Sequence, residues 1–480
     1  MSSTIDKKVL HTIIGLGIIF GFWLLPEFAP ITKYGWKILG LFIGTIYLWT
    51  FVDTIWPSFF AVLMYVITGY TNMGGALSAA FGSSIFWMLV CIMAMFSVVN
   101  EIGLGERITV KLLTMKFLQG HPWRFTFVFF ITLAILANSA GGITAVFLLW
   151  SILSLIRRVC NLEKGNTYLH LMALGVAFFG AGSQCFLPFR NTMLLSMIAI
   201  CGDAIGEINY TAFMAAGIPV WFAILIVYIL MMKYVFRCDV SFMQDLNLDV
   251  INKDLGVMKK EEKVLSVILL SWLVVLIIGS CSPAGSIIGK YFARIGGIYG
   301  ATMLFFVLSS IWIINTQPLV SFQKAAGTIP WGMLLMIAIA TSIGTPLMSQ
   351  EAGIKAFLVA NLTNVLTGHS VVLLIALAIF VSVILTNLAN NMAIAMMFAP
   401  LFVAVNEVQS IPLMSILMLL TFSCNFAIVL PSASPVSAML FANDELVIKS
   451  RHFKFAVITV VMGYIVLMCV GYPLASVLIG

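Results

Sequence analysis

Charged side chains are scarce in this sequence. Asp, Glu, Lys and Arg make up 9% of its 480 residues, and 62% of the residues are hydrophobic, whereas roughly a quarter of the residues in a soluble domain are charged. So few charges cannot solvate a globule of this size, and the mean hydropathy of +1.11 is typical of a chain with many bilayer-spanning segments. We therefore predict an all-α polytopic membrane protein.

The sequence also lacks the motifs of common enzymes and metal sites. Its eight cysteines are scattered, with no C-x-x-C and no nearby histidines, as expected of small apolar packing residues. No HExxH, nucleophile elbow or phosphate-binding glycine loop occurs. We therefore expect no enzyme activity and no cofactor. We also expect no nucleic-acid partner, because in a membrane protein the net charge of +7 has to be interpreted by the side of the membrane on which the cations lie.

Apolar segments of spanning length recur along the chain. The first follows Lys7 and Lys8 and has no small-residue cleavage pattern behind it, so we expect it to be retained as a span. Eleven segments are predicted to span the bilayer, near residues 10–28, 36–52, 55–71, 83–100, 168–206, 211–236, 263–281, 296–315, 330–348, 411–443 and 454–478.

Two further apolar regions, 123–156 and 369–405, are too long for one span. Polar residues and glycines break each region at its centre, at "ANSAGG" (137–142) and "TNLANN" (386–391). The halves are about 15 residues long, and roughly 20 are needed to cross. Lys and Arg flank both ends of the first region and neither end of the second, so we predict two re-entrant hairpins that enter from opposite sides, the inner one at 123–156 and the outer one at 369–405.

The distribution of basic residues orients the chain. With eleven spans and two hairpins, the N-terminus is cytoplasmic and the C-terminus external. Of the 25 Lys and Arg residues, 19 then lie inside and five outside (33, 37, 290, 294 and 355), and Arg190 lies within the membrane. This bias predicts a multi-pass protein of the plasma (inner) membrane.

The two halves of the chain resemble each other at a nearly constant offset. Trp87 matches Trp331, 244 residues on, Glu101 matches Glu351 at 250, Asn138 matches Asn391 at 253, and Pro188 matches Pro435 at 247. Hairpins from opposite faces make the halves inverted repeats, an arrangement typical of secondary transporters. The predicted organisation is N-terminal scaffold helices at 1–80, a first half at 81–236, a cytoplasmic linker at 237–262 and a second half at 263–480.

Polar residues at a hairpin tip within the membrane indicate a binding site. Non-helical backbone is tolerated at that depth where it lines a cavity or is buried in protein, and it offers carbonyls to a cation and helix N-termini to an anion. The alternative is that Asn and Thr only cap the breaks or bridge helices. The occurrence of the feature at both related positions favours function.

At these motifs the sequence resembles the divalent anion:sodium symporter family of dicarboxylate, citrate and sulfate carriers. The resemblance covers nearly the whole chain and rests on "FGSSIFWMLVCIMAMFSVVNEIGLGERITVKLL" (81–113), "IPWGMLLMIAIATSIG" and "LPSASPVSAMLFANDELVIK". It implies eleven spans and two opposed hairpins, a scaffold domain that forms a homodimer, and a transport domain that moves in an elevator-like shift. It also implies a small anionic substrate and Na⁺ as a candidate coupling ion.

The resemblance further implies site residues, although the family motifs are altered here. The family has Ser-Asn-Thr at both hairpin tips, where this chain has Ala137-Asn138-Ser139 and Asn390-Asn391-Met392. By resemblance, Asn138 and Asn391 would touch the substrate carboxylate, and the full set of candidate substrate residues is Asn138, Ser139, Arg190, Asn191, Asn390, Asn391, Ser434 and Ser437. Those implied for a second sodium site are Thr386, Ala389, Asn390, Asn391 and Pro435, and those for a weakened first site are Ala137 and Asn138.

Arg190 is the most unusual of these residues. A charge at mid-membrane costs at least about 2.5–3.5 kcal/mol and normally faces a polar cavity; the alternative is an Arg that snorkels or bonds backbone carbonyls. Our hypothesis is that its guanidinium takes over part of the first cation's role and neutralises a di- or tricarboxylate, in cation-coupled symport or in anion exchange. The alternative function is a related ion transporter that moves a neutral or monoanionic solute or exchanges cations.

Overall fold

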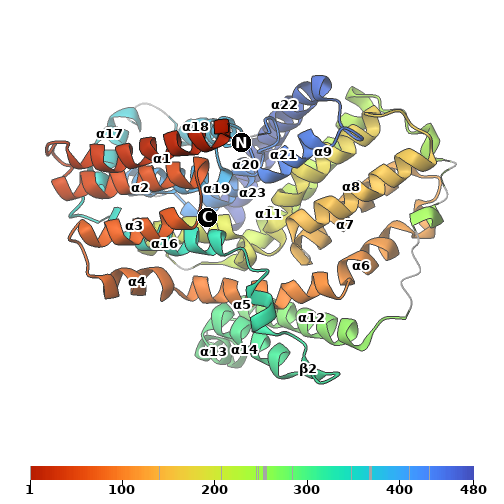
Figure 1. The fold of residues 1–480 in the computed structure, drawn as a ribbon, viewed down its shortest axis with the longest axis horizontal. Helices are drawn as coiled ribbons and strands as arrows, with labels where there is room; N and C mark the ends of the chain where they lie inside the picture. The colour runs from red at the N-terminus through yellow and green to blue at the C-terminus, as the bar shows by residue number, and fades with distance from the viewer. Residues whose placement is uncertain are drawn as a thin grey trace.

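The computed structural model is almost entirely helical (Figure 1). It describes residues 2–139, 141–206, 208–244, 246, 248–251, 257–283, 285–347, 349–366, 370–409, 411–431 and 433–479. Two short antiparallel strands, β1 (Ile313–Ile314) and β2 (Gln317–Pro318), pair Ile313 with Pro318. The predicted all-α membrane class is confirmed.

The helices before the linker form the first group. Their bounds are α1 Ser2–Trp23, α2 Lys33–Phe51, α3 Trp56–Ile67, α4 Met73–Phe81, α5 Ser84–Glu101, α6 Leu104–Leu113, α7 Pro122–Ser139, α8 Gly142–Val159, α9 Thr167–Gly182, α10 Thr192–Cys201 and α11 Tyr210–Leu230. Short 3-10 turns η2 (Ser183–Phe186) and η3 (Pro188–Arg190) separate α9 from α10.

The helices after the linker form the second group. Their bounds are α12 Lys260–Cys281, α13 Ile287–Arg294, α14 Gly297–Ile311, α15 Phe322–Ala326, α16 Trp331–Leu347, α17 Ile354–Leu366, α18 Val371–Thr386, α19 Asn391–Gln409, α20 Leu413–Cys424, α21 Pro435–Ala442, α22 Lys449–Val466 and α23 Tyr472–Leu478. In Figure 1, α1–α4 lie together at one end of the molecule and α6–α8 at the other.

Helix length and apolarity agree with a membrane protein. Within the described residues, seven helices are long and apolar enough to cross a bilayer, or nine if each of two bent pairs counts as one span. The predicted spans at 168–206 and 411–443 are each interrupted, and their first arms lie at the centre of the bundle: every residue of α20 is buried, as are most of α9. The elements that break are therefore enclosed by protein, where irregular backbone is tolerated.

Both predicted hairpin regions fold as two helices joined by a short break. α7 packs along α8, and α18 packs along α19. The arms have 18, 18, 16 and 19 residues, somewhat more than predicted, because the helices continue into polar residues at their outer ends such as Arg158 and Gln409. The first break falls between Ser139 and Gly142 and the second at residues 387–390, as the sequence predicts.

The two halves repeat the same local contacts. The indole Nε1 of Trp87 donates to the carbonyl of Phe81 (2.8 Å), and that of Trp331 donates to the carbonyl of Ala326 (2.9 Å). Each tryptophan thereby fixes the turn that precedes its own helix, which is the correspondence expected from the sequence offset.

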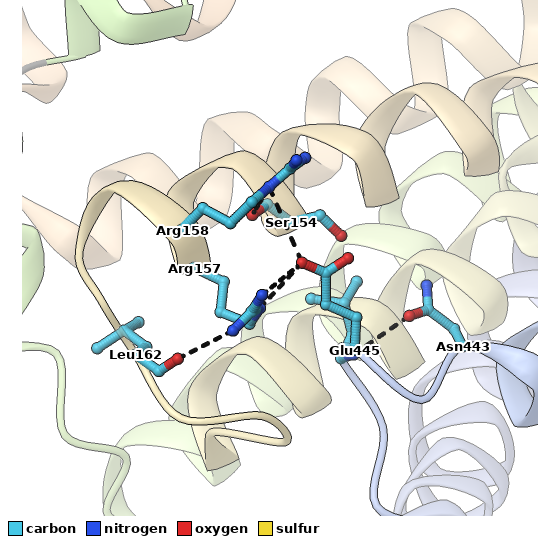
Figure 2. A network of polar contacts seen from close by, with 7 residues as sticks. Ser154, Arg157, Arg158, Leu162, Asn443 and Glu445 are labelled. Carbon is cyan, nitrogen blue, oxygen red and sulfur yellow. Dashed lines mark hydrogen bonds and ion pairs between the residues drawn. The ribbon is translucent and has the colours of Figure 1, made fainter.

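Polar contacts group the loops that the sequence predicts on the linker side. Figure 2 shows Arg157, at the end of α8, donating from Nε and Nη2 to Oε1 of Glu445 (3.0 and 2.7 Å), in the loop between α21 and α22. Gln119, before α7, donates to the carbonyl of Leu246 in the linker (2.8 Å). The end of the inner hairpin, the start of α22 and the linker therefore share one face.

Segments near the starts of α2 and α17 and the end of α19 also contact one another. The hydroxyl of Thr32 donates to the carbonyl of Glu351 (2.7 Å). Lys355 forms an ion pair with Glu407 at the outer end of α19 (2.6 Å). The segment before α2, the start of α17 and the end of α19 therefore lie near one another.

Candidate substrate and cation site

A cavity of 1160 Å³ lies where the breaks of both halves meet. The tip of the inner hairpin contributes Asn138 and Gly141, and the start of α19 contributes Asn391. The break between α9 and α10 contributes Arg190, and the break between α20 and α21 contributes Ser434. All four interrupted elements therefore face one space that is large enough for a small hydrated solute.

Asn138 ties the inner hairpin to the broken helix beside it. It is the last residue but one of α7 and is 8% exposed. Its Nδ2 donates to the carbonyls of Ala134 in its own helix and Ser183 in the α9–α10 break (both 2.9 Å). Both of these bonds use Nδ2, so the acceptor Oδ1 takes no part in them and can accept from another donor.

Asn387 makes the same connection in the outer hairpin. Its Nδ2 donates to the carbonyls of Val383 (2.8 Å) and Phe426 (3.1 Å), and its Oδ1 accepts from the backbone N–H groups of Ile428 (3.0 Å) and Val429 (2.8 Å). Both hydrogens of Nδ2 and both acceptor positions of Oδ1 are therefore used, and three of the four partners belong to the α20–α21 break.

Asn387, 249 residues after Asn138, is therefore its structural counterpart, a role that the sequence comparison gave to Asn391. The offset is the signal that identifies it, because 249 lies within the 244–250 spread of the Trp, Glu and Pro pairs and 253 lies outside it.

Arg190 is the last residue of η3, contacts the C-terminal end of α7 and lines the cavity. Its Nη1 donates to the backbone carbonyl of Asn138, and its guanidinium lies 4.2 Å from the ring centroid of Phe96 in α5, within cation–π range. Arg190 makes no ion pair with any described carboxylate, although Glu101 and Glu261 line the same cavity. Its charge therefore stays uncompensated by protein within the described chain.

The two hairpins offer different helix N-termini to the cavity. α8 begins after Gly141, which has a φ of +97° and no side chain to cap the helix, and residues 141–144 line the cavity. The N-terminus of α19 is capped by the residue before it: Oδ1 of Asn390 accepts from the N–H groups of Met392 and Ala393 (3.0 and 3.2 Å). Free N–H groups at a helix start attract anions, so the first half carries the donors.

Oxygen atoms dominate on the side of the second half. The hydroxyl of Thr386 donates to the carbonyl of Cys424 at the end of α20 (2.6 Å), one turn from a bond between the hydroxyls of Ser382 and Ser423 (2.8 Å). Asn425, next in the chain after Cys424, lines the cavity. Hydroxyl and carbonyl oxygens converging on a helix break are the ligands that suit an alkali cation.

Residues 6–479 match the family described as the sodium:sulfate symporter transmembrane region. The chain belongs to this family. It is similar to the sodium-dependent dicarboxylate transporter SdcS of Staphylococcus aureus strain MRSA252, at 21% identity over 519 residues that cover 99% of this chain and 94% of the relative. SdcS of Staphylococcus saprophyticus is 20% identical over 440 residues, covering 85% and 81%.

Two solved transporters share the fold of this family member. The YdaH transporter of Alcanivorax borkumensis superposes with a TM-score of 0.56 at 12% identity, over 86% of this chain and 88% of that one. MtrF of Neisseria gonorrhoeae superposes with a TM-score of 0.58 at 13% identity, over 98% and 94%. At such identities the likeness shows the fold alone.

The cavity of this sodium:sulfate symporter family member brings together only part of the predicted site. Ala137, Asn138, Arg190, Asn391, Ser434 and Pro435 line it. Ser139, Asn191, Thr386, Ala389, Asn390 and Ser437 are not among its lining residues.

Three of the residues outside the lining have hydrogen bonds that explain their position. Asn191 is fully buried and caps α10 through Oδ1 on the N–H of Leu194 (3.1 Å). The hydroxyl of Ser139 donates to its own helix at Ile135, and that of Ser437 donates to the carbonyl of Leu430. These side chains stabilise the backbone around the cavity through hydrogen bonds to main-chain groups.

Proposed function

We propose that this protein is a secondary active transporter of small anions, di- or tricarboxylates first, with sodium as the coupling ion. The observation that carries the proposal is a cavity at the meeting point of both broken helices and both hairpins, with an arginine whose charge no described carboxylate compensates. The SdcS relatives are named sodium-dependent dicarboxylate transporters, which supports the same substrate and ion.

The anion is assigned to the side formed by the first half. Arg190 offers a planar fork that matches a carboxylate, and the open start of α8 offers backbone N–H groups and the favourable end of its dipole. Thr144, an exposed residue of the cavity wall, adds a hydroxyl. Asn138 contributes an acceptor, which suits a hydroxyl of a hydroxy acid such as citrate better than a carboxylate.

Sodium is assigned to the side formed by the second half. Thr386, the carbonyl of Cys424 and backbone oxygens of the outer tip, near Ala389 and Asn390, form the proposed set, with Pro435 beyond the break. A cation there would lie between the C-terminal ends of α18 and α20, where the helix dipoles are negative. Its binding would favour an anion in the adjoining cavity.

The proposed movement is elevator-like. The transport domain would consist of the two hairpins and the broken helices to which they are bound, and the scaffold domain, which also forms a homodimer, would include α1–α5, α12, α14 and α16. The cavity walls include Glu261, at the end of the predicted linker, and part of the segment from Ile314 to Met333. With the proposed orientation, N-terminus cytoplasmic and C-terminus external, this cavity would open inward.

Counterflow in proteoliposomes tests the proposal. Vesicles preloaded with a dicarboxylate, a tricarboxylate or sulfate should take up labelled anion of the same class, and an inward sodium gradient should accelerate net uptake. Uptake of none of these anions, with or without sodium, would refute the proposal and favour a neutral solute or cation exchange. Empty vesicles and vesicles preloaded with glucose are the controls.

A further inference from the structure

We infer that Arg190 is a built-in cation at the first half of the site, so that the anion binds there without a sodium ion and sodium acts only at the second half. This inference rests on the proposed anion transport and adds to it the identity of the counter-charge. It is carried by what the guanidinium contacts and by the partners of the surrounding oxygens.

The guanidinium occupies the position at which a cation would bind the inner tip. Its Nη1 donates to the carbonyl of Asn138, which is one of the last carbonyls of α7 and has no intrahelical N–H partner. The C-terminus of a helix carries partial negative charge that attracts cations. The guanidinium of Arg190 therefore compensates the partial negative charge at the C-terminal end of α7, as a sodium ion would.

The remaining oxygen atoms of the inner tip leave little for a metal ion. Ala137 carries no hydroxyl. The hydroxyl of Ser139 donates to the carbonyl of Ile135 (2.7 Å), and that of Ser183 donates to the carbonyl of Gly180 (2.8 Å) and lies 3.3 Å from Nδ2 of Asn138. Both hydroxyls are held against backbone carbonyls of their own helices, and a sodium ion at the carbonyl of Asn138 would have to displace a guanidinium of the same charge.

The outer tip lacks such a cation. Thr386 lies at the position that Ala137 occupies in the inner tip, 249 residues further on, and its hydroxyl contacts the carbonyl of Cys424. No basic residue follows α20 in the way that Arg190 follows α9: the segment 425–437 is "NFAIVLPSASPVS". The two halves of the repeat therefore differ in one respect that matters for charge: the first has a fixed cation at its tip, and the second has hydroxyl and carbonyl oxygens without a basic side chain.

Aromatic packing keeps the arginine in place. Its guanidinium covers the face of Phe96 at 4.2 Å. Trp272 of α12 packs edge-on against both Phe96 (5.8 Å between centroids) and Phe189 (5.5 Å), the residue that precedes the arginine. With one nitrogen on Asn138 and one face on Phe96, the rest of the fork remains for a carboxylate, to which planar bidentate bonding is suited.

The test is the binding of an anion in the absence of sodium. Purified full-length protein in detergent is unfolded thermally in a choline buffer with and without succinate and citrate, and again in a sodium buffer. We expect either anion to raise the unfolding temperature of the wild type without sodium, and sodium to raise it further. In Arg190→Gln the anion affinity without sodium should fall about ten- to a hundredfold, the loss of a charge-assisted contact.

Matched variants separate charge from folding. Arg190→Lys keeps the charge and loses the fork, so it should retain part of the sodium-free binding. Arg294→Gln removes an exposed arginine at the end of α13 and should bind as the wild type does. If Arg190→Gln does not fold, the wild type and Arg190→Lys still decide the question.

Each outcome has one meaning. Wild-type protein that binds succinate or citrate only with sodium would overturn the inference and leave the proposed sodium-coupled transport intact. Sodium-free binding that is unchanged in Arg190→Gln would also overturn it. Absence of binding and of uptake for every anion in both buffers would refute the proposed function itself.

Discussion

The ion pair between Arg157 and Glu445 should hold the inner hairpin against the loop between α21 and α22 (Figure 2). Two guanidinium nitrogens share Oε1 of the carboxylate, and Nη1 of Arg157 also donates to the carbonyl of Leu162 (3.2 Å). The side chains are 19% and 34% exposed. A charge-assisted hydrogen bond contributes about 1.5–3 kcal/mol when buried, and we expect about 1–2 kcal/mol here after allowance for solvent screening.

A double-mutant cycle measures this energy. Arg157→Gln, Glu445→Gln and the double variant are unfolded reversibly in micelles, and the coupling free energy should be about 1–2 kcal/mol. The exposed pair of Lys449 and Asp444, 3.0 Å apart with side chains 61% and 73% exposed, is the matched control, with an expected coupling of about 0.5 kcal/mol or less. Equal coupling in the two pairs would refute the reasoning.

The same contact predicts a dependence on pH. Partial burial favours the neutral acid of Glu445, but the hydrogen bonds from Arg157 and Ser154 and the charges of Arg157 and Arg158 outweigh it, so the pKa of Glu445 lies below its ordinary value of 4.5. A lowered carboxyl pKa contributes stability that is complete above the unfolded-state pKa and fades as the pH falls through the folded value. The stability difference between wild type and Glu445→Gln should therefore be constant near neutral pH and shrink below about pH 4.5.

Three further substitutions test the site and its frame. Asn387→Ala should lower the free energy of unfolding by about 1–3 kcal/mol, because two N–H groups and one carbonyl of the α20–α21 break and the carbonyl of Val383 lose their partner; an unfolding titration that matches the wild type would contradict this. Thr386→Val should raise the sodium concentration for half-maximal uptake at least about fivefold, the loss of roughly 1 kcal/mol, and Thr386→Ser should restore it. Gly165→Ala should destabilise the protein by about 1–3 kcal/mol, since Gly165 has a φ of +68° and an added methyl group would overlap Ile448; a thermal scan checks it.

The sequence predicts the architecture well, for physical reasons. Spans and breaks follow from hydropathy and from polar residues in apolar context, so the interruptions at 137–142 and 386–391 appear where expected. The pairing of Trp87 with Trp331 also holds, because each indole has a local partner five or six residues upstream. Features that depend on a short stretch of chain are visible in that stretch.

The sequence predicts individual contacts less well. Asn387 and Asn391 both lie in one polar cluster, and composition cannot decide which of them reaches a break some 40 residues away in the chain. Composition also cannot show that Asn191 caps a helix and that Ser437 bonds a turn carbonyl. The same polar atoms could equally contact a ligand, and the sequence does not distinguish the two uses. For Arg190, hydropathy indicates a cavity, but the carbonyl of Asn138 and the ring of Phe96 come from two other helices.

The two asparagine ties limit how access to the cavity can be controlled. Asn387 is joined to its broken helix by three backbone groups, at Phe426, Ile428 and Val429, and Asn138 is joined to its own at Ser183. A hairpin that swung outward as a separate gate would have to break these buried bonds together. In the proposed movement, each hairpin would therefore travel together with its broken helix, and a solute would be released as this unit moves away from cavity walls such as α5 and α16.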